Sequence, residues 1–338
     1  MEKKSRIIGY DYLRVFAIFM VVVIHGNVSL IANKSSSWTA AMGISTFCLI
    51  SVPCFLMISG ALLLDTEGEL PWMVLKKRLA KQALPFVVWS VIYVFARIVL
   101  KKIPASIHVF TSLLSEPAYY QFWFMYTLLA IYLLLPILVS LVRCISRKVY
   151  RYMLGIWLLF SVVQPTFGNF VPALRLSGHI DLILCEGYIG YFLLGYYLKK
   201  YGSQVTTAKA VWLFVCGCGL TGVLAWGEYV FSGASFQGYF YRSYLTPGVV
   251  MAASGAFLFF QNRTYAHSSV ITYLSNVSIG VFYIHMLVMT AFEYFIFSGA
   301  DHLLLCEVKC VAVYVVSVVA AFCLARISGV RKILLGMN

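Results

Sequence analysis

The sequence predicts an all-α fold, a polytopic transmembrane helical bundle of about ten spans with both termini cytoplasmic. Three observations support this fold class. Of the 338 residues, 62% are hydrophobic and only 11% are charged, whereas a soluble domain carries roughly 25% charged residues. The apolar residues form runs of about 20, the length of a helix that crosses the hydrocarbon core of a bilayer. Lysine and arginine collect in alternate loops between these runs, as in multi-pass membrane proteins.

Apolar runs define the expected helices. Short polar turns separate the runs, and no Ser/Gly linker or low-complexity tract interrupts them, so residues 1–338 are predicted to form a single integral membrane domain. Boundaries inferred from a sequence are soft by several residues. The expected helices cover residues 8–30, 38–64, 82–100, 120–142, 150–166, 181–198, 208–230, 244–261, 272–297 and 308–326.

The distribution of lysine and arginine predicts the orientation. With the N-terminus inside, 18 of these residues fall in cytoplasmic loops and seven in outer loops, while Arg14 stays within the first helix. Such a bias sets the topology of membrane proteins, and we expect the inner (cytoplasmic) membrane of the cell. The formal net charge of +14 has the same explanation, because no basic cluster lies outside the short loops. The lipid bilayer is therefore the expected partner, and nucleic acid is not.

Nine cysteines are present, but their spacing predicts neither a metal site nor a disulfide framework. Most lie within apolar runs and no C-x-x-C pair occurs, so small packing residues are the default interpretation and no metal is expected. The first apolar run contains Asp11, Arg14 and His25, and no small-residue cleavage site follows it. We therefore expect it to remain as the first helix and not to be removed as a signal peptide.

Three ionisable residues lie in line on the first predicted helix. Charged side chains within a span are costly, so each is a candidate for function. Arg14 and His25 are 11 residues apart, which is about three helical turns and roughly 20° around the axis. Asp11 lies one turn before Arg14 and can pair with it. At a rise of about 1.5 Å per residue, His25 is expected roughly 16 Å deeper than Arg14. We predict a catalytic role for all three.

Each of these residues also has a structural interpretation. His25 could be a packing imidazole that is hydrogen-bonded to a neighbouring helix, although its alignment with Arg14 in a span favours function. Arg14 could extend its guanidinium to the inner interface, and this interpretation is nearly as well supported as a functional one. Asp11 could do no more than hold Arg14.

A basic turn before the third predicted helix is a candidate for phosphate binding. Lys77, Arg78 and Lys81, together with Lys76, place four cations near a helix N-terminus, which suits a phosphate-rich ligand by charge and by free N–H donors. Ordinary positive-inside charge is at least as well supported by composition alone. Neither a G-x-x-x-x-G-K-[ST] nucleotide loop nor a G-x-S-x-G elbow occurs.

The later spans contain further ionisable residues. Glu186 and His285 are either site residues or satisfied partners in hydrogen bonds between helices, and both interpretations stay open. For Glu293, the sequence favours a structural role as an interhelical hydrogen-bond partner.

Six segments together resemble the acyltransferase-3 family of integral membrane acyltransferases. The first is the R-x10-H element from Arg14 to His25. No segment is specific by itself, but the six occur in that family's order along nearly the whole chain, which in size and layout is similar to the family's stand-alone members. The others are VPCFLMISGALLL (52–64), KKRLAKQALPFVVWS (76–90), FWFMYTLLAIYLLLPIL (122–138), YIGYFLLGYYLKKYG (188–202) and LSNVSIGVFYIHMLV (274–288).

The resemblance implies a membrane O-acetyltransferase that uses acetyl-CoA as co-substrate and a hydroxyl of a cell-surface or lipid-linked carbohydrate as acceptor. A sugar hydroxyl is a poor nucleophile at neutral pH, and the neutral imidazole of His25 can accept its proton. The basic turn and Arg14 can hold the polyanionic end of acetyl-CoA. The developing oxyanion needs a hydrogen-bond donor, for which Trp123, Tyr283 and His285 are candidates. The expected substrate-binding residues are Trp123, Glu186, Tyr283 and His285.

A permease-like carrier is the alternative function. Buried charges aligned on a helix also build substrate and proton pathways in transporters. Some domains similar to this family are fused to amino-acid racemases and resemble carriers, so the cargo would be a small polar solute such as an amino acid. A structural subunit without activity is poorly compatible with the aligned charges on the first helix. The acceptor sugar, the identity of the short acyl group and the formation of a homo-oligomer are left open by the sequence.

Overall fold

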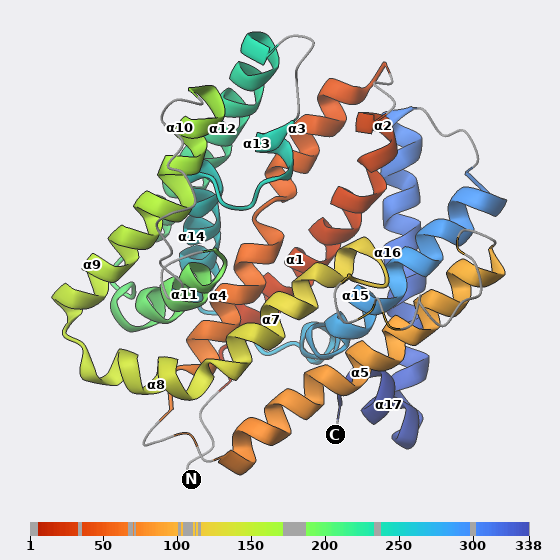
Figure 1. Cartoon of the computed structure of the whole chain (residues 1–338), viewed down its shortest axis with the longest axis horizontal. Helices are drawn as coiled ribbons and strands as arrows, with labels where there is room; N and C mark the ends of the chain where they lie inside the picture. Colours follow the sequence, from red (N-terminus) through yellow and green to blue (C-terminus); the bar gives the residue numbers. More distant parts are fainter. Residues whose placement is uncertain are drawn as a thin grey trace.

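The computed structural model is a bundle of α-helices, with no strand in the part of the chain that it describes (Figure 1). The first and last described residues lie at the same end of the molecule (Figure 1). An even number of spans requires this arrangement, and which side of the membrane this end faces stays a prediction. The structure describes residues 6–32, 36–66, 70, 72–100, 103, 111, 113, 116–171, 187–232, 238–297 and 302–337.

Seven helices of the described part are long and apolar enough to cross a membrane, and a bent pair raises this number to eight. The predicted polytopic all-α bundle is therefore confirmed. The expected ranges 181–198 and 244–261 overlap the shorter helices α11 (Ile189–Tyr201) and α14 (Pro247–Asn262), so the count of about ten spans stays a prediction. The seven spans are Ile8–Ile31, Trp38–Leu63, Trp72–Val99, Arg147–Phe170, Thr207–Ser232, Ser269–Phe295 and Leu303–Ala325.

Several spans are built from two consecutive helices. The remaining helices include short connections, whereas α11 and α14 pack inside the bundle. In chain order the helices are α1 (Ile8–Gly26), α2 (Val28–Ala32), α3 (Trp38–Cys48), α4 (Ser51–Leu63), α5 (Trp72–Val99), α7 (Trp123–Leu133), α8 (Leu135–Cys144), α9 (Arg147–Trp157), α10 (Gln164–Phe170), α12 (Thr207–Ser232), α13 (Tyr239–Arg242), α15 (Ser269–Phe295), α16 (Leu303–Ala325) and α17 (Ser328–Leu335), besides α11 and α14.

Helix α1 lies inside the bundle and contacts α4, α14, α15 and α16. Glycines permit this close approach: a side chain at Gly9 would meet the carbonyl of Phe260 on α14, and one at Gly26 would meet the Cys310 Sγ on α16. Small residues at helix contacts serve the same purpose in other membrane bundles. The polar face of α1 is therefore surrounded by protein.

The third helix begins earlier than the sequence predicts. Helix α5 begins at Trp72 and not near residue 82, so the basic turn is helical and forms the first turns of α5. Lysine, arginine and leucine have high helix propensity, and they continue the helix beyond the apolar run that defined the prediction. Lys77, Arg78 and Lys81 consequently lie at positions fixed by a helix.

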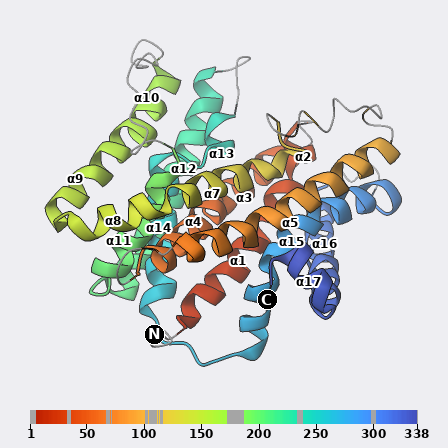
Figure 2. The ribbon, with the colours of Figure 1, turned by 60° about the horizontal axis from the view of Figure 1, so that its bottom comes forward.

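The predicted helix over 120–142 is broken. The turn η2 (Tyr120–Phe122) leads into α7, and α8 then departs at an angle of 57°. Pro136 stands in the first turn of α8, where its missing N–H is harmless but the hydrogen-bond ladder of α7 cannot continue. Helix α7 runs beside α5 across one face of the molecule (Figure 2).

The C-terminal helix α17 packs on the basic end of α5. The indole Nε1 of Trp89 donates a hydrogen bond to the Leu334 carbonyl at 2.8 Å. Gly336 follows the last residue of α17 with a φ of 60°, and a side chain there would meet the Lys81 carbonyl. This packing brings the C-terminal residues close to the first turns of α5.

Candidate active site

The start of α1 is fixed by an ionic network around Asp11. The buried carboxylate accepts hydrogen bonds from Arg6 Nε at 2.6 Å and Arg6 Nη2 at 2.8 Å, and from Ser275 Oγ at 2.7 Å. Arg14 Nη1 lies 3.8 Å from Asp11 Oδ1, an ion-pair distance that is too long for a hydrogen bond. Asp11 is therefore held mainly by Arg6 and Ser275, and it joins α1 to α15.

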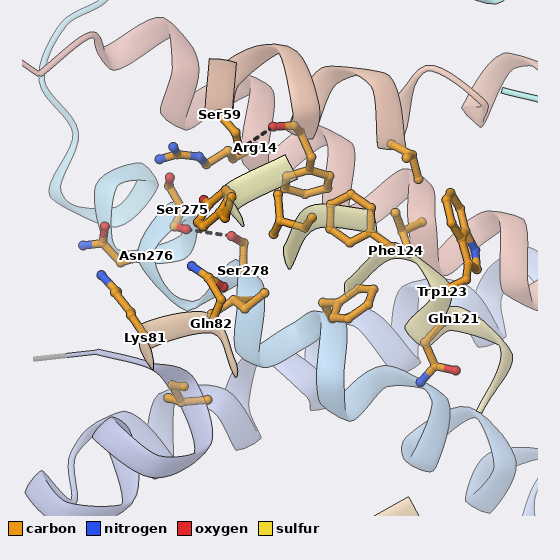
Figure 3. Close-up of a pocket in the computed structure, with 18 of the residues that line it drawn as sticks. Arg14, Ser59, Lys81, Gln82, Gln121, Trp123, Phe124, Ser275, Asn276 and Ser278 are labelled. Atoms are coloured by element: carbon orange, nitrogen blue, oxygen red, sulfur yellow. Dashed lines mark hydrogen bonds between the residues drawn. The ribbon is translucent and has the colours of Figure 1, made fainter. Parts of the chain in front are cut away.

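A cavity of about 270 Å³ extends along α1 and is lined by both Arg14 and His25. The helical spacing had predicted that the two side chains share one face, and they do share one cavity. Figure 3 shows Arg14, Ser275, Asn276, Lys81 and Gln82 at one end of this cavity, and Trp123 and Gln121 towards the other. The two ends differ in chemistry, since the first is polar and basic while the middle is apolar.

The polar end brings together side chains from three helices. Arg14 comes from α1, Lys81 and Gln82 from α5, and Asn276 from α15. None of the described lining residues is acidic, so this end favours an anion. Of the three basic-turn residues predicted to bind the donor, only Lys81 lines the cavity. Lys77 is exposed, and Arg78 is half-buried.

The apolar middle of the cavity has aromatic walls. Phe55 on α4, Phe124 and Tyr132 on the η2–α7 segment, and Phe282 on α15 line it. Phe124 packs against Phe55 and Phe282, with ring centroids 6.3 Å and 5.8 Å apart. These walls belong to the same cavity as Arg14 and His25.

His25 lies among other rings at the far end of α1. The His25 imidazole stacks on His285, with centroids 5.3 Å apart, and meets the edge of Tyr120 at 5.0 Å. His285 Nδ1 lies 2.7 Å from the Phe282 carbonyl; because a carbonyl only accepts, this nitrogen carries the proton and Nε2 is a free acceptor. Within the described part of the chain, His25 Nδ1 and His285 Nε2 have no hydrogen-bond partner.

The predicted substrate-binding residues are only partly brought together. Trp123 lines the cavity and packs on Tyr188 and Tyr244, with centroids 5.0 Å and 5.7 Å away. His285 touches His25 but does not line the cavity. Tyr283 points elsewhere and stacks on Trp89 at 5.7 Å. Glu186 lies outside the described residues.

Sequence reasoning missed several polar residues of the cavity. Gln82, Gln121 and Asn276 all line it, but neutral amides in or beside apolar runs do not stand out as charges do. Their best signal is position: Gln82 follows Lys81, Gln121 precedes Trp123, and Asn276 lies in the LSNVS segment that precedes His285. Glu293, expected as an interhelical partner, does pair with Lys309 on α16 at 2.9 Å.

Together, the membrane helices and the cavity with a basic end and a partly buried imidazole define a polytopic membrane protein with an enzyme-like site. Comparison with known families matches residues 7–327 to the acyltransferase domain of the acyltransferase-3 family, so the chain belongs to that family. It is thus a multi-pass membrane acyltransferase, and this membership does not favour the carrier alternative. No curated protein and no solved structure matches the chain.

Proposed function

We propose that this protein transfers an acetyl group from cytoplasmic acetyl-CoA to a hydroxyl of a cell-surface or lipid-linked carbohydrate, in the inner membrane. One observation carries the proposal: a single cavity is lined by Arg14 and Lys81 at one end and also by His25, with no acid among its described lining residues. Acetyl-CoA has the matching shape, since its phosphates lie at one end and its thioester lies at the tip of a long, slim arm.

The donor would lie along the cavity from the basic end inward. Arg14 and Lys81 would hold phosphate oxygens, and Arg14 can do so with two parallel N–H donors. The arm would pass the aromatic walls of Phe55, Phe124 and Phe282. Eleven residues of helix separate Arg14 from His25, roughly 16 Å at about 1.5 Å per residue, so a donor held by its phosphates would bring its thioester near the imidazole.

The chemistry requires one base and one oxyanion donor. Neutral His25 would accept the proton of the acceptor hydroxyl while its oxygen forms a bond to the thioester carbonyl carbon. The resulting oxyanion would accept a hydrogen bond from Trp123 Nε1 or the Gln121 amide, which line the same cavity. The tetrahedral intermediate then breaks its C–S bond, and the coenzyme A thiolate takes the proton back from the imidazolium. The acetyl ester and free coenzyme A leave, and His25 is neutral again.

Purified protein in lipid nanodiscs would test this proposal. Release of free thiol from acetyl-CoA would be followed spectroscopically, and surface glycans of cells with and without the protein would be compared by mass spectrometry. We expect acetyl-CoA-dependent thiol release and a mass difference of one acetyl group on a glycan. Uptake of a small solute into vesicles without thiol release would instead support a carrier.

A further inference from the structure

A second cavity lies between α5 and α15, at the end of α5 opposite the basic turn. Its volume is about 600 Å³. Lys81 and Arg97 on α5 are 16 residues apart, so at about 1.5 Å per residue this cavity begins roughly 24 Å from the basic end. The positive-inside distribution predicts that it faces the outer leaflet. Its lining includes Tyr93, Arg97, Tyr119, Thr290, Glu293 and Tyr294.

A fixed carboxylate belongs to this cavity. Lys309 on α16 is only 2% exposed, and its Nζ donates to Glu293 Oε1 at 2.9 Å. The Glu293 side chain nevertheless remains 46% exposed, so the carboxylate is accessible from the cavity that it lines. A buried lysine in a membrane helix is costly, and its pairing with Glu293 holds this carboxylate in place. If the tyrosines of this cavity only anchored the protein at the membrane interface, no ion pair of Lys309 and Glu293 would be needed beside them.

The rim of the second cavity is apolar and exposed. Val99 is 77% exposed and Phe295 is 78% exposed, one on each of the two helices that border the cavity. In a bilayer these side chains face lipid tails. The cavity thus joins a polar interior with Arg97 and Glu293 to an apolar rim, which matches a ligand with a polar head and a lipid tail.

Rings connect this cavity to His25. Tyr93 and Tyr119 line the cavity, with centroids 5.1 Å apart. Tyr119 contacts Tyr120 at 5.0 Å, and Tyr120 in turn contacts His25 at 5.0 Å. Arg97 Nη1 donates to the Ala118 carbonyl at 2.8 Å, which ties this segment to α5. Along this path, only the side chains of Tyr119 and Tyr120 lie between the second cavity and the His25 imidazole.

We propose that the second cavity binds the acceptor, a saccharide attached to a lipid anchor. Two hydroxyl groups of the sugar would donate hydrogen bonds to the Glu293 carboxylate, and the apolar face of the sugar would pack on the tyrosine rings. The lipid anchor would extend into the bilayer between Val99 and Phe295. Movement of the Tyr120 side chain would then admit a sugar hydroxyl to His25. This inference rests on the proposed acetyl transfer, because it assigns the acceptor of that reaction.

Photolabelling tests the site directly. The probe is dodecyl glucoside with a diazirine on the alkyl carbon next to the sugar, and its comparison is dodecanol with the same diazirine. Both are irradiated with the full-length protein in phosphatidylethanolamine–phosphatidylglycerol nanodiscs, and labelled peptides are mapped by mass spectrometry. We expect sugar-dependent labelling within residues 96–100 and 290–295. Equal labelling by the two probes, or labelling confined to residues of the first cavity, would overturn the proposal.

Two blocking variants sharpen the test. Ala96→Trp and Ala291→Trp add bulk from opposite walls of the cavity, and Val315→Trp on the exposed face of α16 is the matched control. We expect labelling to fall to the sugar-free level in both blocking variants and to persist in the control. Acetyl-CoA binding, measured on the same samples, verifies that each variant is folded. Persistent labelling in folded blocking variants contradicts the acceptor site, whereas a wild-type protein that labels but never consumes acetyl-CoA contradicts the proposed function.

Discussion

The imidazoles of His25 and His285 stack with centroids 5.3 Å apart and an interplanar angle of 29°. His285 is locked by its Nδ1–H, which donates to backbone carbonyls of its own helix. His25 has no such anchor at Nδ1 within the described residues, and it lines the cavity while His285 does not. The two rings therefore differ in their surroundings, and under the proposed function His25 is the one expected to exchange a proton with a substrate.

Replacement of His25 tests the base. His25→Gln retains hydrogen bonding but cannot accept a proton, so we expect turnover to fall roughly 10²–10⁴-fold, the usual contribution of a positioned base. Acetyl-CoA binding should be retained, because the phosphates lie at the other end of the cavity. His267→Gln, at an exposed loop position, is the control. Near-normal acetylation by His25→Gln would make the imidazole a packing element.

Replacement of the basic residues tests the donor site. Arg14→Gln and Lys81→Gln should raise the KM for acetyl-CoA, because both side chains line the polar end of the cavity. Acetyl-pantetheine lacks the nucleotide phosphates and should be used equally by the variants and the wild type. High salt should mimic Lys81→Gln in part, since an exposed charge is screened.

Lys209→Gln is the matched control for the donor site, because Lys209 is exposed at the start of α12 and does not line the cavity. An equal loss with acetyl-CoA and with acetyl-pantetheine would show that the variants damage folding and do not remove a phosphate contact.

The C-terminal tail is predicted to shape the donor site. Gly336 has a φ of 60°, and a side chain there would collide with the Lys81 carbonyl. Gly336→Ala should therefore cost about 1–3 kcal/mol in strain and displace Leu335 and Met337, which line the cavity. We expect a lower melting temperature and a higher KM for acetyl-CoA. Gly329→Ala in the preceding helix α17, where nothing lies within 4 Å, should change neither quantity.

Helix packing gives a prediction on stability alone. A side chain at Gly60 of α4 would collide with the Phe192 carbonyl of α11. Gly60→Ala should lower the free energy of unfolding by about 1–3 kcal/mol, as overpacking does elsewhere. Gly219→Ala in α12 meets open space and should be neutral or slightly stabilising, because alanine favours a helix. Thermal unfolding in detergent measures both, and equal effects would contradict the close contact of α4 and α11.

Topology can be tested without a ligand. If the lysine and arginine bias sets the orientation, a reporter after Lys101 is extracytoplasmic and one after Lys148 is cytoplasmic. Alkaline phosphatase and green fluorescent protein fusions at the two positions distinguish the sides. The same location for both reporters would rule out the bent segment η2–α8 as a span.

The sequence by itself determined the features that depend on local periodicity and composition. Apolar runs of membrane length predicted an all-α bundle, because a backbone in lipid must satisfy its hydrogen bonds within a helix. The 11-residue spacing of Arg14 and His25 predicted a shared face, because an α-helix turns by a fixed angle per residue. Both results hold whatever the neighbouring helices do.

Only the tertiary structure decided which distant side chains meet. Lys81 lines the cavity and Lys77 does not. The two residues lie on nearly the same face of α5, but Lys77 stands one turn earlier, about 6 Å along the helix axis. Tyr283 stacks on Trp89, although it is two residues from His285 in the sequence. Gln121 lines the same cavity as His25 because it lies in the turn η2, directly before α7. Such convergence depends on helix–helix contacts between residues far apart in the chain, and no local pattern records it.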